Sequence, residues 1–120
     1  NLKKNIKFKG FKKNIGQLKD QIYICASLFE GCCNATIEAL NNSKIIISSN
    51  CPGGNSEIIL NGKGGELFLS NNFKSLARSM NLVANNLPKQ IKKAKIARKN
   101  LHRFKLQSNK LSYENIFNKI

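Results

Sequence analysis

Acidic residues, histidine and long apolar runs are scarce in this sequence, and each scarcity narrows the possible functions. Six Asp and Glu stand against 21 Lys and Arg, so the formal net charge is +15. The sole histidine, His102, lies far along the sequence from the cysteines, which argues against a Cys-His metal site or nucleophile. No apolar run approaches the roughly 18 residues that a membrane-spanning helix requires. The first residues contain no apolar stretch, so we expect no signal peptide.

The four cysteines are Cys25, Cys32, Cys33 and Cys51, and none of them forms a C-x-x-C pair. Because structural zinc sites usually use such close pairs, we expect no zinc and no other metal. Without an export signal, we expect reduced thiols in a cytoplasmic protein. Cys25 fits a buried strand position, and we interpret Cys51 as a small loop residue.

The positive charge is unevenly distributed along the chain. Residues 1–20 carry seven Lys and one Asp, and residues 73–120 carry twelve Lys or Arg and one Glu. Residues 21–72 carry two Lys and four Glu. Lys, Asn and Ile together make up 50 of the 120 residues, so part of the excess reflects a compositional bias typical of AT-rich genomes. The remainder favours contact with anions, which include phosphate ligands, anionic lipids and nucleic acid.

Hydrophobic periodicity and turn residues predict alternating strands and helices. The predicted strands span residues 5–9, 22–26, 44–49 and 66–69. The predicted helices span residues 14–20, 35–41, 57–60, 73–84 and 88–107, with a short last helix holding Leu111, Ile116 and Phe117. Residues 44–49 are continuously apolar or β-branched, which is typical of a strand buried on both faces. This order predicts an α/β fold with a mainly parallel sheet in one domain.

The segment 27–40 has the features of a ligand site. It follows the predicted strand 22–26, passes through a loop that contains Gly31, and enters a helix that Asn34 can cap. A strand, a tight turn and a helix N-terminus together can hold an anion. Glu30 and Glu38 bracket the loop and could bind hydroxyl groups. A phosphate and hydroxyls on one ligand suggest a nucleotide-sugar.

This segment carries a family resemblance. Its sequence, S-L-F-E-G-C-C-N-A-T-I-E-A-L, resembles the E-x7-E motif of retaining glycosyltransferases of the GT-B fold, family 4. The similarity continues in register through I-I-I-S-S-N-C-P-G-G-N-S-E-I-I-L-N-G-K-G-G-E-L-F. The earlier run I-K-F-K-G-F-K-K-N is similar to the strand and loop that precede the motif. Nearly the whole chain is covered by the resemblance.

The resemblance implies a Rossmann-like domain that binds a UDP-linked nucleotide diphosphate-sugar and transfers its sugar to an acceptor hydroxyl with retention. Glu30 would lie beside the donor sugar as the catalytic residue, and Glu38 would bind the ribose hydroxyls. The diphosphate would be held at the helix start by residues of one loop, namely Gly31, Cys32, Cys33, Asn34, Ala35 and Thr36. No metal and no further cofactor are implied.

Two departures limit what the resemblance implies. The loop after the motif helix usually carries G-K-P, and here it is Ser43-Lys44-Ile45; the Cys32-Cys33 pair also replaces what is often an aromatic and a small residue. Residues 1–120 would form only the second half of a donor-binding domain. We therefore expect the N-terminal domain of the same enzyme as a partner, and no transfer by this portion alone.

The basic segment 88–107 has three interpretations. It can be a solvated face that covers the sheet, which we favour, or it can contact an anionic membrane. Membrane contact would suit an enzyme at the inner face of the cell membrane with a saccharide or lipid-linked acceptor, in surface polysaccharide or glycolipid synthesis. Nucleic-acid binding ranks third because no aromatic residues are interleaved with the charges. The alternative to an enzyme is therefore a basic module that binds nucleic acid or anionic membranes.

Four polar residues near these motifs also have plainer interpretations. Ser27 and Thr36 suit turn or cap hydrogen bonds as well as ligand contacts. Glu57 suits the first turn of a helix, and His102 suits a solvated helix face.

Overall fold

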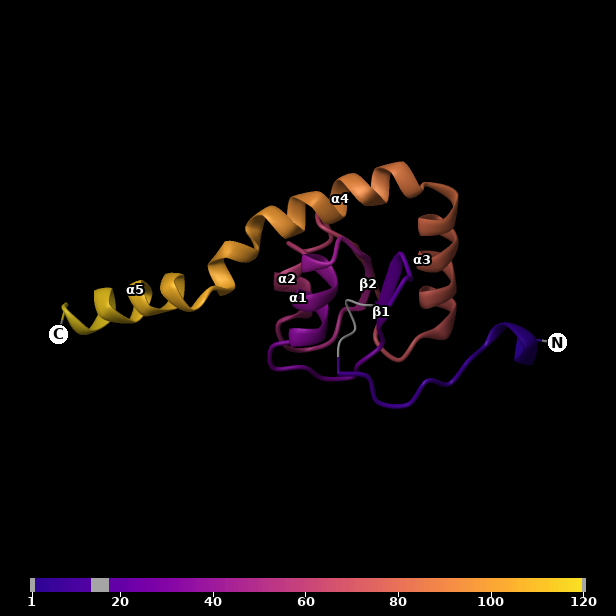
Figure 1. Ribbon diagram of the computed structural model, residues 1–120, viewed down its shortest axis with the longest axis horizontal. Coiled ribbons are helices and arrows are strands. Elements are labelled where there is room, and N and C mark those ends of the chain that lie inside the picture. The colour runs from indigo at the N-terminus through magenta and orange to yellow at the C-terminus, as the bar shows by residue number, and fades with distance from the viewer. Residues whose placement is uncertain (1, 14–17, 120) are drawn as a thin grey trace.

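The computed structural model describes residues 2–13 and 18–119, which form a three-stranded parallel sheet with helices on both faces (Figure 1). The strands are β1 (Ile22–Cys25), β2 (Ile45–Ser49) and β3 (Glu66–Phe68), in the order β1-β2-β3. The α-helices are α1 (Asn34–Asn41), α2 (Asn55–Ile58), α3 (Phe73–Asn85), α4 (Leu87–Lys99) and α5 (Leu106–Phe117), and the 3-10 helices are η1 (Leu2–Asn5) and η3 (Asn100–Phe104). The predicted α/β class is confirmed.

The central strand β2 organises the sheet. All five of its residues are buried, as its apolar, β-branched sequence predicts for a strand covered on both faces. It pairs in parallel with β1 and with β3. Cys25 of the edge strand β1 is buried, as predicted, whereas Ile24 is 37% exposed. Among the described residues, β1 pairs with β2 alone, so its other side lacks a neighbour.

Two hydrophobic clusters lie on opposite faces of the sheet, because successive side chains of β2 point to opposite sides. Ile46 packs with Leu40 of α1, Ile58 of α2 and Ala97 of α4 on one face. The other face packs against α3, and its buried members are Ile45, Ile47, Phe68 and Val83. In Figure 1, α1 and α2 lie on one side of the strands and α3 lies on the other. This two-layer covering is what positions the loops at the strand ends.

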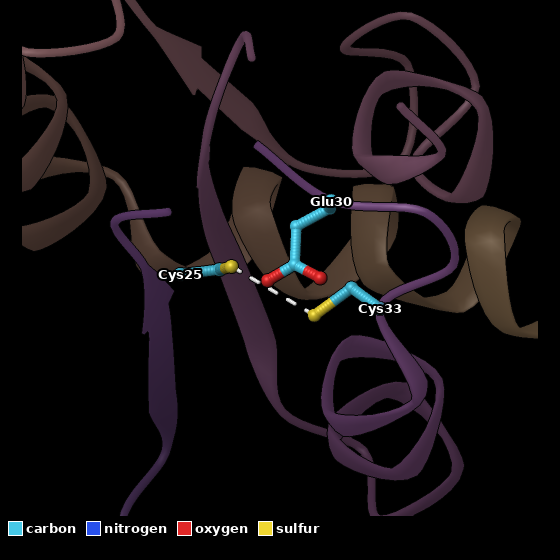
Figure 2. A group of neighbouring side chains, drawn as sticks. All are labelled: Cys25, Glu30 and Cys33. Carbon is cyan, nitrogen blue, oxygen red and sulfur yellow. Dashed lines mark hydrogen bonds between the residues drawn. The ribbon is translucent and has the colours of Figure 1, made fainter. Parts of the chain in front are cut away.

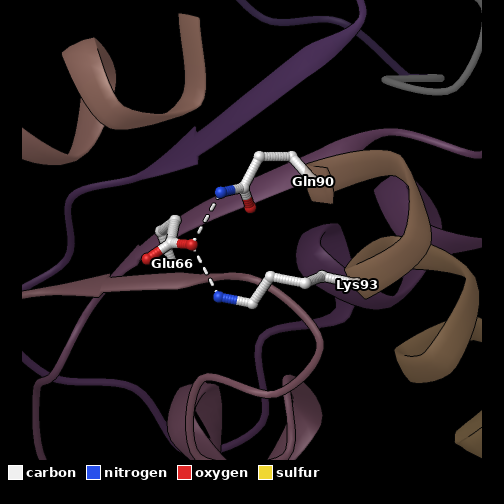
Figure 3. Close-up of polar contacts among 3 residues, drawn as sticks. All are labelled: Glu66, Gln90 and Lys93. Carbon is white, nitrogen blue, oxygen red and sulfur yellow. Dashed lines mark hydrogen bonds and ion pairs between the residues drawn. The ribbon is translucent and has the colours of Figure 1, made fainter. Parts of the chain in front are cut away.

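Helix α4 is held to the sheet by a close approach and by a polar cluster. A Cβ atom added to Gly64 would stand 2.4 Å from the Cβ of Ala97, so only glycine lets α4 lie this near. Glu66 Oε1 accepts hydrogen bonds from Gln90 Nε2 at 2.8 Å and from Lys93 Nζ at 2.6 Å (Figure 3). These contacts fix α4 against β3.

Two predictions for the N-terminal part differ from the structure. Residues 6–12 are not a strand and have no regular structure, and Phe8 is 97% exposed. A segment of alternating polarity is stable as a strand only when it pairs with a neighbouring strand, and within the described ranges residues 6–12 pair with no strand. Of the predicted helix 14–20, residues 14–17 lie outside the described residues, and residues 18–20 are not helical.

The C-terminal helices do not have the predicted boundaries. Instead of one helix over 88–107, α4 ends at Lys99, η3 follows, and Lys105 is extended before α5. Ala94 and Ala97 of α4 and Leu101 of η3 are buried in the same core cluster, whereas Ile91 is 46% exposed. The α5 helix has no buried residues and extends away from the sheet (Figure 1). The short α2 begins two residues earlier than predicted.

The helices in the described ranges include none with the length and apolarity needed to cross a membrane.

Candidate functional site

The site lies where the loop after β1 meets the loop after β2. Parallel strands end at the same edge of a sheet, so these two loops are neighbours. The Glu30 N–H donates to the Pro52 carbonyl at 3.1 Å, and the Gly54 N–H donates to the Gly31 carbonyl at 3.0 Å. Two backbone hydrogen bonds thus join the loops on either side of Gly53.

The glycines in the second loop make this approach possible. Gly53 has φ +117°, and a Cβ atom there would stand 1.4 Å from the Glu30 carbonyl oxygen. A Cβ atom on Gly54 would stand 2.9 Å from the Gly31 carbonyl oxygen. The loop after β2, with its two adjacent glycines, therefore supports the backbone of Glu30 directly.

Glu30 is a half-buried carboxylate with a defined partner. The Ser27 hydroxyl donates to Glu30 Oε1 at 2.5 Å, and the Ser49 hydroxyl donates to the Ser27 carbonyl at 2.6 Å. Ser27 thus makes the turn hydrogen bond that was one of its two expected roles. Figure 2 shows the Glu30 carboxylate between the side chains of Cys25 and Cys33. The acid is oriented before any ligand arrives.

The start of α1 differs from the prediction in one residue. Cys33, not Asn34, is the N-cap, and Asn34 is the first helical residue without a side-chain cap bond. The reason is local: the Asn34 N–H donates to the Cys32 carbonyl at 3.0 Å and the Thr36 N–H to the Cys33 carbonyl at 3.0 Å. The helical turn therefore begins one residue earlier than an Asn34 cap would allow.

The N–H groups ahead of this helix remain open. Within the part of the chain that the structure describes, the backbone N–H groups of Gly31, Cys32, Cys33 and Ala35 have no hydrogen-bond acceptor. Open N–H groups at a helix start carry partial positive charge. They can therefore bind an anion at this point.

The remaining predicted site residues divide by burial. Gly31, Cys32 and Asn34 are exposed, and Ala35 is partly buried. Cys33 and Thr36 are buried and point inward, where the Thr36 hydroxyl donates to Cys33 Sγ at 3.1 Å. Their side chains thus make a cap contact. The Cys33 N–H is one of the open donors, whereas Thr36 is fully buried and its N–H already donates to the Cys33 carbonyl, so the predicted ligand contact of Thr36 does not fit this structure.

Glu38 lies on the exposed face of α1. It is four residues after Asn34, so the two side chains share a face, and helical side chains tilt toward the N-terminus of the helix. Among the described residues, the Glu38 carboxylate has no hydrogen-bond or ionic partner, which leaves it available. The structure thus places Glu30 in the loop before α1 and Glu38 on the exposed face of the helix, one turn after its first residue.

Two cysteines meet in a way that sequence spacing did not reveal. Cys25 ends β1 and Cys33 caps α1, and their sulfur atoms lie 3.8 Å apart (Figure 2). One carboxylate oxygen of Glu30 and these two sulfur atoms all lie within 4.8 Å of one another. The order of elements could have predicted this contact, because in a strand–loop–helix unit the last residue of the strand and the N-cap of the helix face each other.

The pKa values of these two thiols are shifted in opposite directions. Burial raises the pKa of Cys25, but hydrogen bonds from Ser27 and from the Asn55 amide (Nδ2 to Sγ, 3.4 Å) outweigh it, so the net pKa is lowered. Burial raises the pKa of Cys33, and the Cys25 charge adds to the effect. Burial, together with both thiols, also raises the pKa of Tyr23 on β1.

The other residues singled out from the sequence have structural partners. Cys51 is buried as a small loop residue, with its sulfur 3.7 Å from the Asn55 amide nitrogen. Glu57 is exposed and pairs with Arg103 at 3.6 Å. His102 is exposed on η3, where its Nδ1 lies 3.0 Å from the Lys99 carbonyl oxygen. None of them lies in the Glu30 cluster as the described residues define it.

Comparison with known proteins gives the family. The family model of "Glycosyl transferases group 1" matches residues 1–100. No curated protein matches the sequence. Among solved structures, sucrose-phosphate synthase from Thermosynechococcus elongatus has a similar fold, with a TM-score of 0.66 and 19% identity. The match covers 83% of this chain but only 26% of that one, so this chain spans about a quarter of that protein's length. Because the family model covers most of the sequence, the chain belongs to the glycosyl transferases group 1 family.

Proposed function

We propose that the chain is the donor-binding portion of a retaining GT-B glycosyltransferase of family 4. It would bind a nucleotide diphosphate-sugar, with UDP as the nucleotide, and take part in transfer of a hexosyl group to an acceptor hydroxyl. The observation that carries the proposal is the oriented carboxylate of Glu30 beside the open start of α1, in a chain of this family.

The diphosphate would bind at the open N–H groups of Gly31, Cys32, Cys33 and Ala35. A diphosphate needs several donors and positive potential, and a helix start supplies both without a metal ion. Cys33 would contribute through its backbone N–H, because its side chain is buried, whereas the Thr36 N–H is already bonded to the Cys33 carbonyl. Gly31 is exposed, and a Cβ there would meet nothing within 4 Å, so ligand atoms can come near its backbone.

The two acids would bind the two sugars of the donor. Glu38, exposed and unpaired among the described residues, would accept hydrogen bonds from the ribose hydroxyls. Glu30 would lie beside the transferred sugar. A carboxylate there can accept hydrogen bonds from the sugar hydroxyl groups and stabilise the positive charge that develops at the anomeric carbon. The Ser27 hydroxyl keeps the Glu30 carboxylate in position for this role.

The rest of the enzyme would cover the open part of the sheet. An apolar hollow of 340 Å³ lies beside the edge strand, and it is lined by Ile22, Ile24, Ile47, Met80, Asn81 and Ala84. Such a surface suits further strands or helices of the same protein. The N-terminal acceptor domain is the partner that we propose, and without it this portion would not catalyse transfer.

The exposed lysines of α4 support a location at the inner face of the cell membrane. Lys89, Lys92, Lys95 and Lys99 are all exposed. Basic helices are attracted to anionic lipid surfaces, where a lipid-linked acceptor would be found. This location suits synthesis of a surface polysaccharide or glycolipid.

Isothermal titration with UDP and UDP-sugars tests the proposal. We expect binding that weakens at least about tenfold in Glu38→Ala, since a hydrogen bond to a charged group is worth about 1.5–3 kcal/mol. Glu57→Ala is the matched control, because that exposed acid pairs with Arg103 away from the loop. Absence of UDP binding, together with salt-sensitive binding of DNA or anionic vesicles, would favour the basic module instead.

A further inference from the structure

The cluster of Cys25, Cys33 and Glu30 has the geometry of a metal site. Zinc binds thiolates at about 2.3 Å in a tetrahedral arrangement, which places two sulfur ligands about 3.8 Å apart. The two sulfur atoms here are 3.8 Å apart, and a Glu30 oxygen completes a group within 4.8 Å. We propose that Cys25, Cys33 and Glu30 form a binding site for a thiophilic divalent cation, with Zn²⁺ as the best fit.

The side chain of each proposed ligand already accepts a hydrogen bond from a neighbouring residue. The Thr36 hydroxyl donates to Cys33 Sγ at 3.1 Å, and the Asn55 amide donates to Cys25 Sγ at 3.4 Å. The Ser27 hydroxyl donates to Glu30 Oε1 at 2.5 Å. Metal ligands in proteins are held in this way by a second layer of hydrogen bonds, which orients them and stabilises their anionic forms.

The backbone around the cluster is also fixed. Cys25 ends a strand of the sheet, and Cys33 caps α1; both are buried. Glu30 is tied by its N–H to Pro52, and its carbonyl lies against Gly53. Two thiolates, one carboxylate and Zn²⁺ carry a net charge of −1, which the positive end of α1 favours. Little reorganisation is needed for binding.

Binding would deprotonate both thiols, form two Zn–S bonds and one Zn–O bond, and release two protons to the solvent. Three protein ligands leave the fourth position of the ion for water. One consequence rests on the proposed function: a bound ion would withdraw Glu30 from the donor sugar, so Zn²⁺ and the UDP-sugar would compete.

Titration of the reduced chain with Co²⁺ tests the site. We expect one equivalent to produce the visible bands of tetrahedral Co²⁺ and ultraviolet thiolate-to-metal absorption, and Zn²⁺ to displace it. Cys25→Ser or Cys33→Ser should abolish the thiolate absorption. Cys32→Ser is the matched control, since Cys32 is exposed and lies outside the group. Circular dichroism would verify that each buried variant remains folded.

Glu30→Gln provides a variant that leaves the buried thiols in place. We expect its dissociation constant for Co²⁺ to rise at least about tenfold, since even second-layer changes cost metal sites 10–100-fold. A wild-type chain without tetrahedral Co²⁺ bands, or equal loss of binding in Cys32→Ser and Cys33→Ser, would overturn the site. UDP binding is a separate measurement, so a chain that binds UDP but not Co²⁺ would refute this inference alone.

Discussion

The carbonyl oxygen of Glu30 occupies the space that a side chain on Gly53 would need. A Cβ atom there would stand 1.4 Å from this oxygen, and Gly53 has φ +117°. The hydrogen bond from the Glu30 N–H to the Pro52 carbonyl closes the same contact from the other side. The loop after β2 therefore determines where the backbone of Glu30 lies.

Gly53→Ala should destabilise the chain by at least about 2 kcal/mol, because the new Cβ clashes with backbone and the positive φ is strained for alanine. Urea denaturation followed by circular dichroism measures this loss. Gly31→Ala is the control: a Cβ there meets nothing within 4 Å, so its midpoint should stay close to that of the wild type. Equal midpoints for both variants would contradict the predicted contact.

The sequence was sufficient for the parts of the fold that rest on local signals. The continuous apolar run of β2 predicted a fully buried strand, and the helical spacing of apolar residues predicted the start of α3 at residue 73. Glu30 and Glu38 were placed around one loop because strand, glycine and helix signals follow one another there. These features depend on neighbours in the chain, which a sequence displays.

The errors arose where a distant partner decides the structure. Residues 5–9 alternate like a strand but have no strand beside them in the described ranges. Cys25 and Cys33 are eight residues apart, a spacing that resembles no metal motif, yet the turn from β1 into α1 brings them together. The start of α1 at Asn34 was set by backbone hydrogen bonds that residue preferences do not reveal.

The polar cluster between β3 and α4 should contribute measurably to stability (Figure 3). Glu66→Ala leaves the partly buried ammonium of Lys93 and the buried amide of Gln90 without their shared acceptor. We expect a loss of about 2–3 kcal/mol in urea denaturation. Glu114→Ala is the control, because its pair with Lys110 is exposed and should cost less than about 0.5 kcal/mol. Similar losses in the two variants would contradict a structural role for the cluster.

Tyr23 should make the chain less stable in strongly alkaline solution. Burial and the nearby Cys33 and Cys25 thiolates raise the pKa of Tyr23 above its ordinary 10.0, so the folded state keeps the phenol neutral. Its stabilising effect is complete below pH 10 and is lost as the pH rises further, because the unfolded chain ionises first.

Above pH 10, this effect should lower the free energy of unfolding by up to about 1.4 kcal/mol per pH unit. Urea denaturation at several pH values should show a shallower decline in Tyr23→Phe than in the wild type. Tyr113→Phe, at an exposed position, serves as the control and should follow the wild type. Parallel declines in the wild type and Tyr23→Phe would show that Tyr23 ionises alike in both states.

The two helix starts offer a direct comparison of an asparagine cap with an asparagine that does not cap. Asn72 precedes α3, and its Oδ1 accepts a hydrogen bond from the Ser75 N–H at 2.9 Å. Asn34 is already inside α1 and makes no cap bond. Asn72→Ala should therefore cost about 1 kcal/mol of stability, the usual value of an N-cap.

Asn34→Ala should cost almost nothing and can even stabilise the chain slightly, because alanine has the higher helix propensity. Thermal denaturation of both variants separates the two cases, with a lowered midpoint only for Asn72→Ala. A comparable loss in Asn34→Ala would mean that Asn34 caps α1 after all. The N–H groups at the helix start would then be partly occupied by its side chain, and the anion site would lose donors that the present geometry leaves open.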